Sequence, residues 1–344
     1  MRRIKYSQAL SEGLVQAMER DDSIFVTGIA VDYQSGIFGS TIEATRRFGP
    51  KRVFDAPAME NGLMGIAIGA AAMGKRPMVV HPRNDFMFLA FDQLINLAAK
   101  WRYMYGGNAG SLPIVIRAVV GKGWGQGATH SQSTHATLAH FPGLKVLMPA
   151  FPADAKGLTL AALQGNSPVV IIEHRALYDT VGDVSEEPLP TPIGKAAVVR
   201  QGSDLTIVAT SYLAVEAMHA AEELARNGIS VEVVDPRSIR PLDEETILAS
   251  VRKTGRLLVA DVSWELCGFS SEIAALAAEK AFSALKGPVR RIALADCPAP
   301  VSAPLESAFY PKASTIARAV MAMLGRDDAG MDRLDREDTF KGPY

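Results

Sequence analysis

Glu60 stands directly before a run of small apolar residues, "NGLMGIAIGAAAMG" (61–74), that predicts a helix. A carboxylate in the first turn of a helix is favoured by the helix dipole. Small residues behind it would also let a ligand or another backbone approach closely. Glu60 is therefore either an ordinary helix-terminal charge or a group that meets a ligand. We expect the inward face of this helix to consist of Gly62, Gly65, Ala67, Gly69, Ala70 and Ala71.

Three histidines occur within eleven residues of the glycine-rich segment 124–143. His130, His135 and His140 recur every five residues, a spacing that does not place them on one helical face, so a shared metal site is not expected. His130 begins the sequence His-Ser-Gln at a strand-to-helix junction, where a loop side chain can face a cleft. It is either a side chain that faces a cleft or a histidine that is hydrogen-bonded within its loop.

Several other chemistries lack their motifs. The chain has no glycine-rich turn followed by Lys-Ser/Thr, no GxSxG elbow and no HExxH helix. The segment "GKGWGQG" (121–127) follows a strand-like run, but its third glycine is displaced from the dinucleotide-binding pattern. Cys267 and Cys297 are too few and too far apart for a disulfide scaffold or a zinc cluster.

The elements that must position Glu60 and His130 follow an alternating pattern. Short, nearly continuous apolar runs suit strands buried on both faces, and they occur at 24–31, 76–81, 112–120, 144–150 and 168–174. Helical patterns lie between them at 6–20, 61–74, 86–104 and 154–164. This alternation predicts an α/β domain in which helices sandwich a parallel sheet, spanning residues 1–180.

The segment 181–193 is rich in proline, glycine and acids and predicts a linker. Beyond it, the same alternation predicts a second, smaller α/β domain over 194–325, in which Asp243 precedes a helix as its N-cap. Residues 326–344 are charged and poor in apolar side chains, which predicts a mobile tail.

Composition disfavours partners that are recognised by charge. The 344 residues carry 36 Lys and Arg against 37 Asp and Glu, so no net basic field favours nucleic acid or an anionic membrane. No stretch reaches the roughly 18 apolar residues of a membrane span, and no signal-peptide pattern opens the chain. A cytoplasmic location is the simplest expectation.

Taken in order, the segments resemble one enzyme family. The stretches "FDAPAMENGLMGIAIGAAAMGKRP", "FDQLINLAAKWRYMYGG", "HSQSTHATLAHFPGLKVLMPAFPADAKGL" and "VEVVDPRSIRPLDEETILASVRKTGRLLV" carry the resemblance, which runs from about residue 4 to residue 324. The chain resembles the β subunit of the thiamine-diphosphate-dependent decarboxylating component of 2-oxoacid dehydrogenases. That resemblance implies a transketolase-like pyrimidine-binding domain followed by a transketolase C-terminal-like domain.

The resemblance also implies roles for single residues. Glu60 would hydrogen-bond the aminopyrimidine ring and so favour the tautomer that removes the thiazolium proton. His130 would lie over the thiazolium side, where it orients the substrate, protonates intermediates or assists acyl transfer. Gln132, Phe86 and His81 are the further residues that we expect to neighbour the cofactor.

The family's diphosphate-binding GDG motif is missing from this chain. Gly182-Asp183-Val184 lacks the second glycine and the following asparagine. The resemblance therefore implies an α subunit that carries the motif and binds most of the Mg²⁺. It further implies a β–β contact within an α2β2 heterotetramer, a lipoyl acyltransferase core as partner, and oxidative decarboxylation of a 2-oxoacid with acyl transfer to a lipoyl group.

The chain departs from the family pattern at three places. His81 and Asn84 stand where an aromatic pair usually packs on the cofactor, although Phe86 follows closely. Ile29 and Ala30 replace acidic residues, and Gly165 replaces an acid of the potassium (K⁺) loop. The resemblance therefore does not carry a potassium site over to this chain.

Two other functions remain open. The chain could be the C-terminal half of a split transketolase or ketol transferase that passes the carbanion to an aldehyde or sugar; such enzymes need basic residues for phosphate, and Arg83, Arg117 and Arg175 are candidates. It could also be a non-catalytic structural partner that retains the fold. The presence of both Glu60 and His130 argues against the second.

Overall fold

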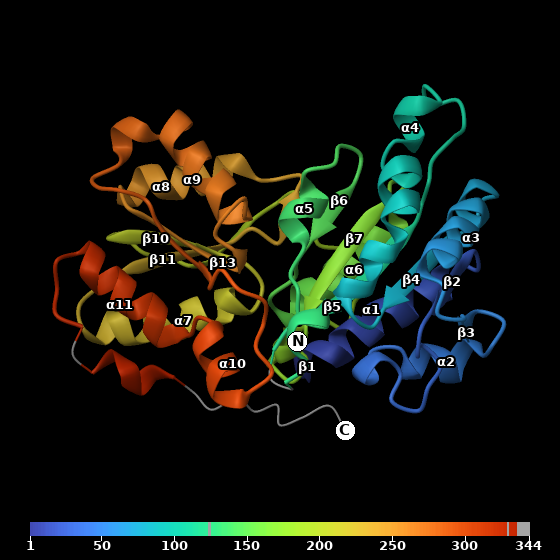
Figure 1. The fold of residues 1–344 in the computed structure, drawn as a ribbon, viewed down its shortest axis with the longest axis horizontal. Coiled ribbons are helices and arrows are strands. Elements are labelled where there is room, and N and C mark those ends of the chain that lie inside the picture. The colour runs from blue at the N-terminus through green and yellow to red at the C-terminus, as the bar shows by residue number, and fades with distance from the viewer. Residues whose placement is uncertain (123–124, 329, 336–344) are drawn as a thin grey trace. The chain divides into compact units, whose positions relative to one another are not determined.

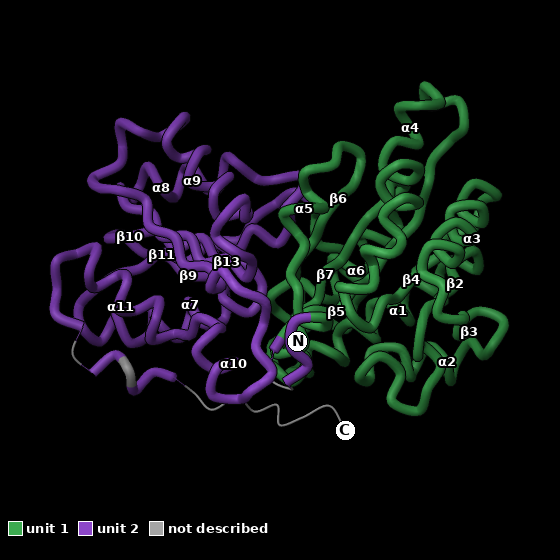
Figure 2. The backbone as a smooth tube through the Cα atoms, in the orientation of Figure 1, with its two compact units in different colours: residues 1–121, 129–193 green, residues 122–128, 194–344 purple. Residues whose placement is uncertain are grey.

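The computed structural model describes residues 1–122, 125–328 and 330–335. The chain forms two compact units: unit 1 comprises residues 1–121 and 129–193, and unit 2 comprises residues 122–128 and 194–344 (Figure 2). Within the described ranges, no helix is long and apolar enough to cross a membrane. Part of the predicted tail, residues 329 and 336–344, lies outside the described residues, as do residues 123–124.

A parallel sheet forms the centre of unit 1, with its strands in the order β6-β7-β5-β4-β2-β3 (Figure 1). These strands are β2 (Ile24–Gly28), β3 (Val53–Asp55), β4 (Arg76–His81), β5 (Val115–Val120), β6 (Lys145–Leu147) and β7 (Val169–His174). All residues of β5 and β7 are buried, as expected for strands covered on both faces. The last residue of β2 must be glycine, because a Cβ on Gly28 would lie 2.3 Å from the Val80 carbonyl oxygen.

Unit 1 also contains helices and a separate two-stranded antiparallel sheet. The helices are α1 (Tyr6–Arg20), α2 (Ile42–Phe48), α3 (Glu60–Ala72), α4 (Trp101–Met104), α5 (His135–Ala139) and α6 (Pro152–Gln164). α1 packs on α6 at a close approach, since a Cβ on Gly13 would lie 2.9 Å from the Lys156 carbonyl oxygen. β1 (Arg2–Lys5) pairs antiparallel with β8 (Val181–Val184), so part of the segment predicted as a linker is a strand.

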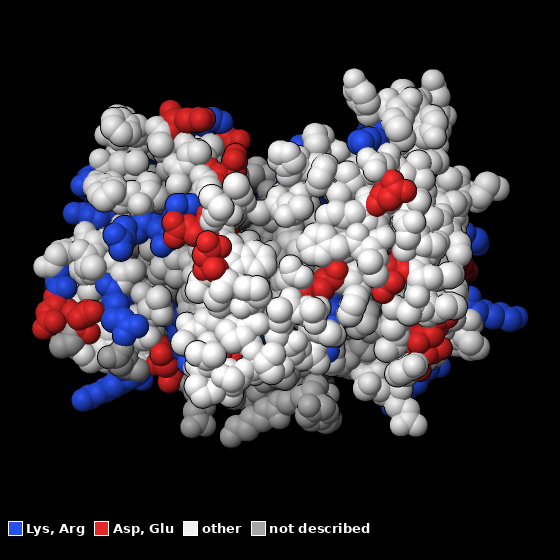
Figure 3. All heavy atoms as spheres, viewed as in Figure 1, with Lys and Arg blue, Asp and Glu red and all other residues white. Residues whose placement is uncertain are grey.

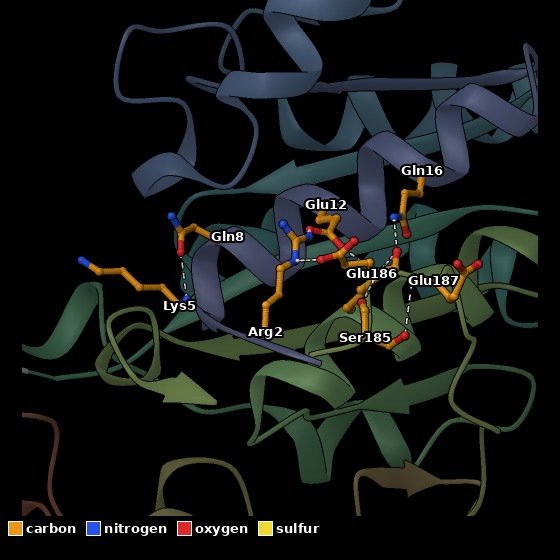
Figure 4. A network of polar contacts seen from close by, with 9 residues as sticks. Arg2, Lys5, Gln8, Glu12, Gln16, Ser185, Glu186 and Glu187 are labelled. Atoms are coloured by element: carbon orange, nitrogen blue, oxygen red, sulfur yellow. Dashed lines mark hydrogen bonds and ion pairs between the residues drawn. The ribbon is translucent and has the colours of Figure 1, made fainter. Parts of the chain in front are cut away.

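A buried lysine ties the segment after β8 to the helices of unit 1. Lys156 on α6 is 2% exposed, and its Nζ donates to Glu12 Oε1 at 2.6 Å and to the carbonyl oxygens of Ser185 and Glu186 at 2.6 and 3.0 Å. Figure 4 shows Glu12 of α1 close to Ser185 and Glu186. The buried charge is thus fully partnered, which offsets its desolvation.

The predicted helix at 86–104 is wrong as a single element. The structure has a 3₁₀ segment, η2 (Asn84–Ala90), then a π-helical segment, η3 (Asp92–Ala98), and then the short α4. The side chains of Asn84 and Asp85, at the start of η2, bond to the distant segment 132–134. These long-range bonds fix the first turn independently of helical periodicity.

The predicted inward face of α3 is also partly wrong. The buried side chains are those of Glu60, Leu63, Met64, Ala67, Ile68 and Ala71. Gly62 and Gly69, which were predicted to face inward, are exposed. The glycines lie instead beside exposed Ile66 and Met73 on the outer face.

Unit 2 contains a second sheet with its strands in the order β14-β13-β10-β11-β9. Within the described residues, β9 pairs antiparallel with β11, and the other neighbouring strands pair parallel. Its strands and helices are β9 (Ala197–Arg200), β10 (Leu205–Ala209), α7 (Tyr212–Arg226), β11 (Val231–Asp235), β12 (Ser238–Arg240), α8 (Glu244–Thr254), β13 (Leu257–Trp264), α9 (Phe269–Lys280), β14 (Arg290–Leu294), α10 (Ala303–Phe309) and α11 (Ala313–Met323). The predicted N-cap is confirmed: Asp243 Oδ1 accepts from the Thr246 backbone N–H at 3.3 Å.

Candidate functional site

The candidate residues of unit 1 follow the carboxyl ends of its parallel strands. Glu60 comes after β3, His81 ends β4, and His130 comes after β5. The carboxyl edge of such a sheet is the usual place for ligands, because the loops that leave it converge there. The fold therefore places these three residues on loops or element ends at one edge of one sheet.

Glu60 is a buried carboxylate at the first residue of α3. It is 8% exposed, and it makes no hydrogen bond or ion pair with another described residue. The helix dipole favours a carboxylate in this first turn. A carboxylate without a described partner can accept a hydrogen bond from a ligand, and its contact with the cofactor stays a prediction.

Asn84 and Asp85 hold the loop that carries His130. Asn84 Nδ2 donates to the Gln132 carbonyl oxygen at 2.8 Å. Asp85 Oδ1 accepts from the Gln132 backbone N–H at 3.2 Å and from Gln132 Nε2 at 2.9 Å. Asn84 is fully buried and Asp85 is 8% exposed, so these bonds are shielded from water. Gln132 is thus held through its backbone and its side chain.

Phe86 contacts the ring of His130 directly. The two ring centroids are 5.3 Å apart and the planes are 86° apart, an edge-to-face arrangement. His130 Nδ1 also lies 2.8 Å from Thr129 Oγ1. The structure therefore brings together three predicted site residues, His130, Gln132 and Phe86, and orients the imidazole from two sides.

His81 is a neutral, buried imidazole. It is 1% exposed, and its Nε2 has no hydrogen-bond partner among the described residues. Burial lowers the pKa of His81 to about 4, so the ring carries no charge near neutrality. Its contact with a cofactor stays a prediction.

Asp55, which sequence reasoning missed, fixes the loop after β2. Its Oδ2 accepts from the Ala30 N–H at 2.9 Å and its Oδ1 from the Val31 N–H at 2.6 Å. Ala30 has a φ of 61°, a left-handed conformation that these bonds help to hold. No strand was predicted at 53–55, and the N–H groups that Asp55 binds lie 24 and 25 residues away, so no local pattern indicated this role.

Arg117 and Glu173 form a buried ion pair between β5 and β7. Arg117 Nε lies 2.5 Å from Glu173 Oε1 and Nη2 lies 2.8 Å from Oε2, and both residues are fully buried. Burial opposes the charge on Arg117, but Glu173 outweighs it and raises the pKa of the guanidinium. Tyr178 donates its hydroxyl to Glu173 Oε2 at 2.6 Å. Arg117 is therefore a structural residue here.

Comparisons with known proteins place this geometry in a family. The model described as "Transketolase, pyrimidine binding domain" matches residues 2–180, and "Transketolase, C-terminal domain" matches residues 194–316. The chain is 39% identical over 334 residues to the acetoin:2,6-dichlorophenolindophenol oxidoreductase subunit beta of Bacillus subtilis, covering 94% of this chain and 97% of the relative. It is 44% identical over 315 residues to the pyruvate dehydrogenase E1 component subunit beta-1, mitochondrial, of Arabidopsis thaliana, covering 90% and 86%.

The chain belongs to this family of dehydrogenase β subunits. A solved structure described as "Split gene transketolase, inactive beta4 tetramer" also matches, with a TM-score of 0.76 and 26% identity over 94% of this chain and 98% of that one. The predicted fold class and the stated resemblance are confirmed. The family depends on thiamine diphosphate, and the name "subunit beta" implies an α-subunit partner.

In this β subunit, the Gly-Asp-Val sequence does not form a phosphate-binding turn. Gly182, Asp183 and Val184 lie in β8, where Asp183 pairs with Arg3 of β1. The described residues also contain no group of three or more His, Cys, Asp or Glu side chains that could hold a metal ion. Neither feature supplies this chain with a diphosphate or magnesium site of its own.

The loop around Gly165, which corresponds to the potassium loop of the family, binds the guanidinium group of Arg76. Arg76 Nη1 donates to the carbonyl oxygens of Leu163 and Gly165 at 3.2 and 2.6 Å, and Arg76 Nη2 donates to Asn166 Oδ1 at 2.8 Å. Asp21 lies 3.2 Å from Arg76 Nε and balances its charge. In this β subunit a side-chain cation thus contacts the loop oxygens. This contact is consistent with Gly165 standing where the family has an acid in its potassium loop.

Proposed function

We propose that this chain is the β subunit of an enzyme that cleaves the carbon–carbon bond beside the carbonyl of a 2-oxoacid or an acyloin, such as acetoin, with transfer of the oxidised acyl group to a lipoyl arm. For a 2-oxoacid this is oxidative decarboxylation. The observation that carries the proposal is Glu60, a buried carboxylate without a described partner at the carboxyl edge of a pyrimidine-binding fold.

Each site residue has a distinct duty in this proposal. Thiamine diphosphate, when bound, supplies the nucleophilic carbon. Glu60 holds a proton at a pyrimidine ring nitrogen, and His130 moves a proton to or from the substrate oxygen. Gln132 and Phe86 fix the loop and ring of His130, as their contacts indicate. His81 takes the place of an aromatic cofactor neighbour.

An α subunit completes the site. It would hold the diphosphate and Mg²⁺, since Gly182–Val184 lie within a strand. Exposed apolar side chains of unit 1 suit a protein partner, and they include Ile66, Met73, Leu89 and Tyr103, which are 61%, 86%, 62% and 92% exposed. An α2β2 heterotetramer with β–β contacts, acting beside a lipoyl acyltransferase core, is the assembly we propose.

Charge does not suggest a nucleic-acid partner. Basic and acidic side chains are interspersed on the face drawn in Figure 3, in keeping with the near balance of 36 basic and 37 acidic residues. A cytoplasmic location stays a prediction.

A ketol transferase is the second candidate, and the match to a split-gene transketolase favours it. It would share Glu60 but pass the two-carbon unit to an aldehyde or sugar acceptor. A non-catalytic role is the third candidate, and it does not account for the buried Glu60 without a described partner.

The test is reconstitution with an α subunit that carries the GDG motif. We expect turnover of pyruvate, a branched-chain 2-oxoacid or acetoin with a lipoyl domain or 2,6-dichlorophenolindophenol as acceptor, and its loss in Glu60→Ala. Turnover only with aldehyde or sugar acceptors would replace the proposal by the ketol transferase. Full activity of the Glu60→Ala complex would contradict the mechanism.

A further inference from the structure

The edge of the unit 2 sheet at which its parallel strands begin carries a cavity with three cationic side chains. The cavity has a volume of about 320 Å³, which lies at the lower end of the range for small-molecule sites. Arg256, Lys286 and Arg290 line it, and the other lining residues, among them Pro288 and Met323, are uncharged. Arg256 directly precedes β13 and Arg290 begins β14, so the cavity lies where two neighbouring strands start.

The strand register places the two arginines on one face of the sheet. Residues two positions apart along a strand share a face, so Arg256 and Leu258 point to the same side. Leu258 of β13 is the register partner of Arg290 on the parallel strand β14, and register partners also share a face. Two guanidinium groups from neighbouring strands therefore line the same cavity.

Lys286 is held at this cavity by the end of α8. Its Nζ donates to the Thr254 carbonyl oxygen at 3.2 Å, and its backbone N–H donates to the Gly255 carbonyl oxygen at 2.7 Å. Gly255 has a φ of 76°, and a Cβ there would lie 2.7 Å from Lys286 Cε, so glycine leaves room for the lysine stem. The helix dipole favours a cation at this end, which explains Lys286 without a ligand.

The two arginine side chains have no such explanation. Neither Arg256 nor Arg290 makes a side-chain hydrogen bond or ion pair with another described residue, and no acidic residue lines the cavity. The next residue along β14, Arg291, is different, because its Nη2 lies 2.6 Å from Glu265 Oε1. Arg256 is half-buried and Arg290 is exposed. The guanidinium donors of both are therefore available to an anion in the cavity.

An apolar groove adjoins the cavity. Gly287 and Pro288 line both, and the groove continues along α9 and the segment after it, where Ala278, Phe282 and Leu285 line it. Its volume is about 670 Å³, and Phe282 is 75% exposed. A ligand that reached from the cavity into the groove would remove apolar surface from water. The combined surface thus offers positive charge at one end and apolar contact at the other.

We propose that Arg256 and Arg290 bind the phosphate group of a small molecule whose apolar part lies in the groove beside Phe282. Each planar guanidinium group can offer paired N–H donors to an oxyanion. With the ammonium group of Lys286 also at the cavity, the charge matches a phosphate dianion better than a monovalent carboxylate. All residues of this site belong to unit 2, and none has a duty in the proposed function, so the site is tested independently of it.

The first experiment compares three probes by calorimetry of the full chain at constant ionic strength: phenyl phosphate, inorganic phosphate and benzoate. We expect saturable binding of phenyl phosphate, weaker binding of inorganic phosphate and the weakest binding of benzoate. No binding of phenyl phosphate above the response to ionic strength would overturn the site. Benzoate that binds as tightly as phenyl phosphate would overturn the assignment to phosphate.

The second experiment removes the arginines one at a time. Arg256→Gln and Arg290→Gln should each weaken phenyl phosphate binding about tenfold or more, because each loses a charged donor to the anion. Arg226→Gln is the matched control, since it removes the same charge from a side chain of α7 that is 74% exposed. Arg290→Lys keeps the charge but loses the fork, so its affinity should be intermediate. Equal losses in site and control variants would contradict the site.

A groove variant separates the apolar part of the site from the cationic part. Phe282→Ala should weaken binding of phenyl phosphate severalfold and leave binding of inorganic phosphate unchanged, because only the larger probe reaches the groove. The side chain is exposed, so the variant is expected to fold. Equal affinities of the variant and the wild type for phenyl phosphate would remove the groove from the proposal.

Two further probes test other sources of the anion. A peptide that alternates Asp with Phe should bind more weakly than phenyl phosphate, because the cavity has the volume of a small-molecule site. Tighter peptide binding that Arg256→Gln abolishes would replace the small molecule by a protein segment. Vesicles of phosphatidylcholine with phosphatidic acid should bind no better than phosphatidylcholine alone, and vesicle binding that depends on Arg256 would assign the site to a lipid headgroup instead.

Discussion

Asp85 holds Gln132 through a single carboxylate oxygen. Its Oδ1 accepts both the backbone N–H and the side-chain Nε2 of Gln132, while its buried Oδ2 has no hydrogen-bond partner among the described residues. The two residues are 47 positions apart in the chain. This contact makes Asp85 the main anchor of the loop that carries His130, and it makes the loop's order testable.

Asp85→Ala should loosen the His130 loop. The variant leaves the two Gln132 donors without their acceptor, so we expect faster hydrogen exchange over 130–134 and about a tenfold loss of kcat in the reconstituted enzyme. Asp22→Ala is the control, since its side chain is fully exposed. Unchanged exchange in Asp85→Ala would show that the loop is held by other contacts.

Glu60→Gln should separate activity from stability. We expect activity to fall by about 10²-fold or more, because an amide does not stabilise a proton at a pyrimidine nitrogen as a carboxylate does. Stability against urea should not fall, since the carboxylate has no described partner to lose and the variant removes a buried charge. Glu187→Gln, on an exposed residue, should change neither quantity. A strong loss of stability would indicate an ordinary structural role for Glu60.

Glu173→Gln should destabilise unit 1 strongly. It leaves the fully buried Arg117 without its counter-ion, which typically costs about 3–5 kcal/mol. The exposed pair of Glu43 and Arg46 provides the comparison, and Glu43→Gln should cost less than about 0.5 kcal/mol. The free energy of unfolding in urea measures both. Similar costs for the two variants would mean that the buried pair contributes no more than a surface pair.

His81 should make stability depend on pH between about 6.5 and 4. The pKa of its folded form is lowered to about 4 by burial, so the unfolded chain binds the proton more readily as the pH falls. The contribution is fully present above pH 6.5 and is lost as the pH falls towards 4, by about 3 kcal/mol in total. The unfolding free energy of the wild type minus that of His81→Phe should therefore fall by this amount from pH 7 to pH 4. A constant difference would contradict the buried neutral state.

Arg76 should make the loop at 163–166 independent of potassium. In the wild type we expect the same thermal midpoint in K⁺ and Na⁺ at equal ionic strength, because the guanidinium already donates to Leu163, Gly165 and Asn166. Arg76→Ala should lower the midpoint by several degrees, since three acceptors lose a charged donor. A midpoint in the wild type that rises specifically with K⁺ would point to a potassium site after all.

Most strands of unit 1, and the two site residues Glu60 and His130, could be predicted from local patterns. Continuous apolar runs marked β2, β4, β5 and β7 because a strand buried on both faces has no polar alternation. The helix predicted at 86–104 failed because side-chain bonds from Asn84 and Asp85 to a distant loop set the backbone at its start. The predicted inward face of α3 failed in part, since Gly62 and Gly69 are exposed and Leu63, Met64 and Ile68 are buried.

The family, the order of the elements and the places of Glu60 and His130 follow from local residue types read in order along the chain. The contacts of the individual arginines could be assigned only from the folded chain. Arg117 pairs with Glu173, whereas Arg83 and Arg175 meet at Phe38. The reason is physical: a parallel sheet brings together residues from strands far apart in the chain, so the neighbours that fix a charge cannot be read from its own segment.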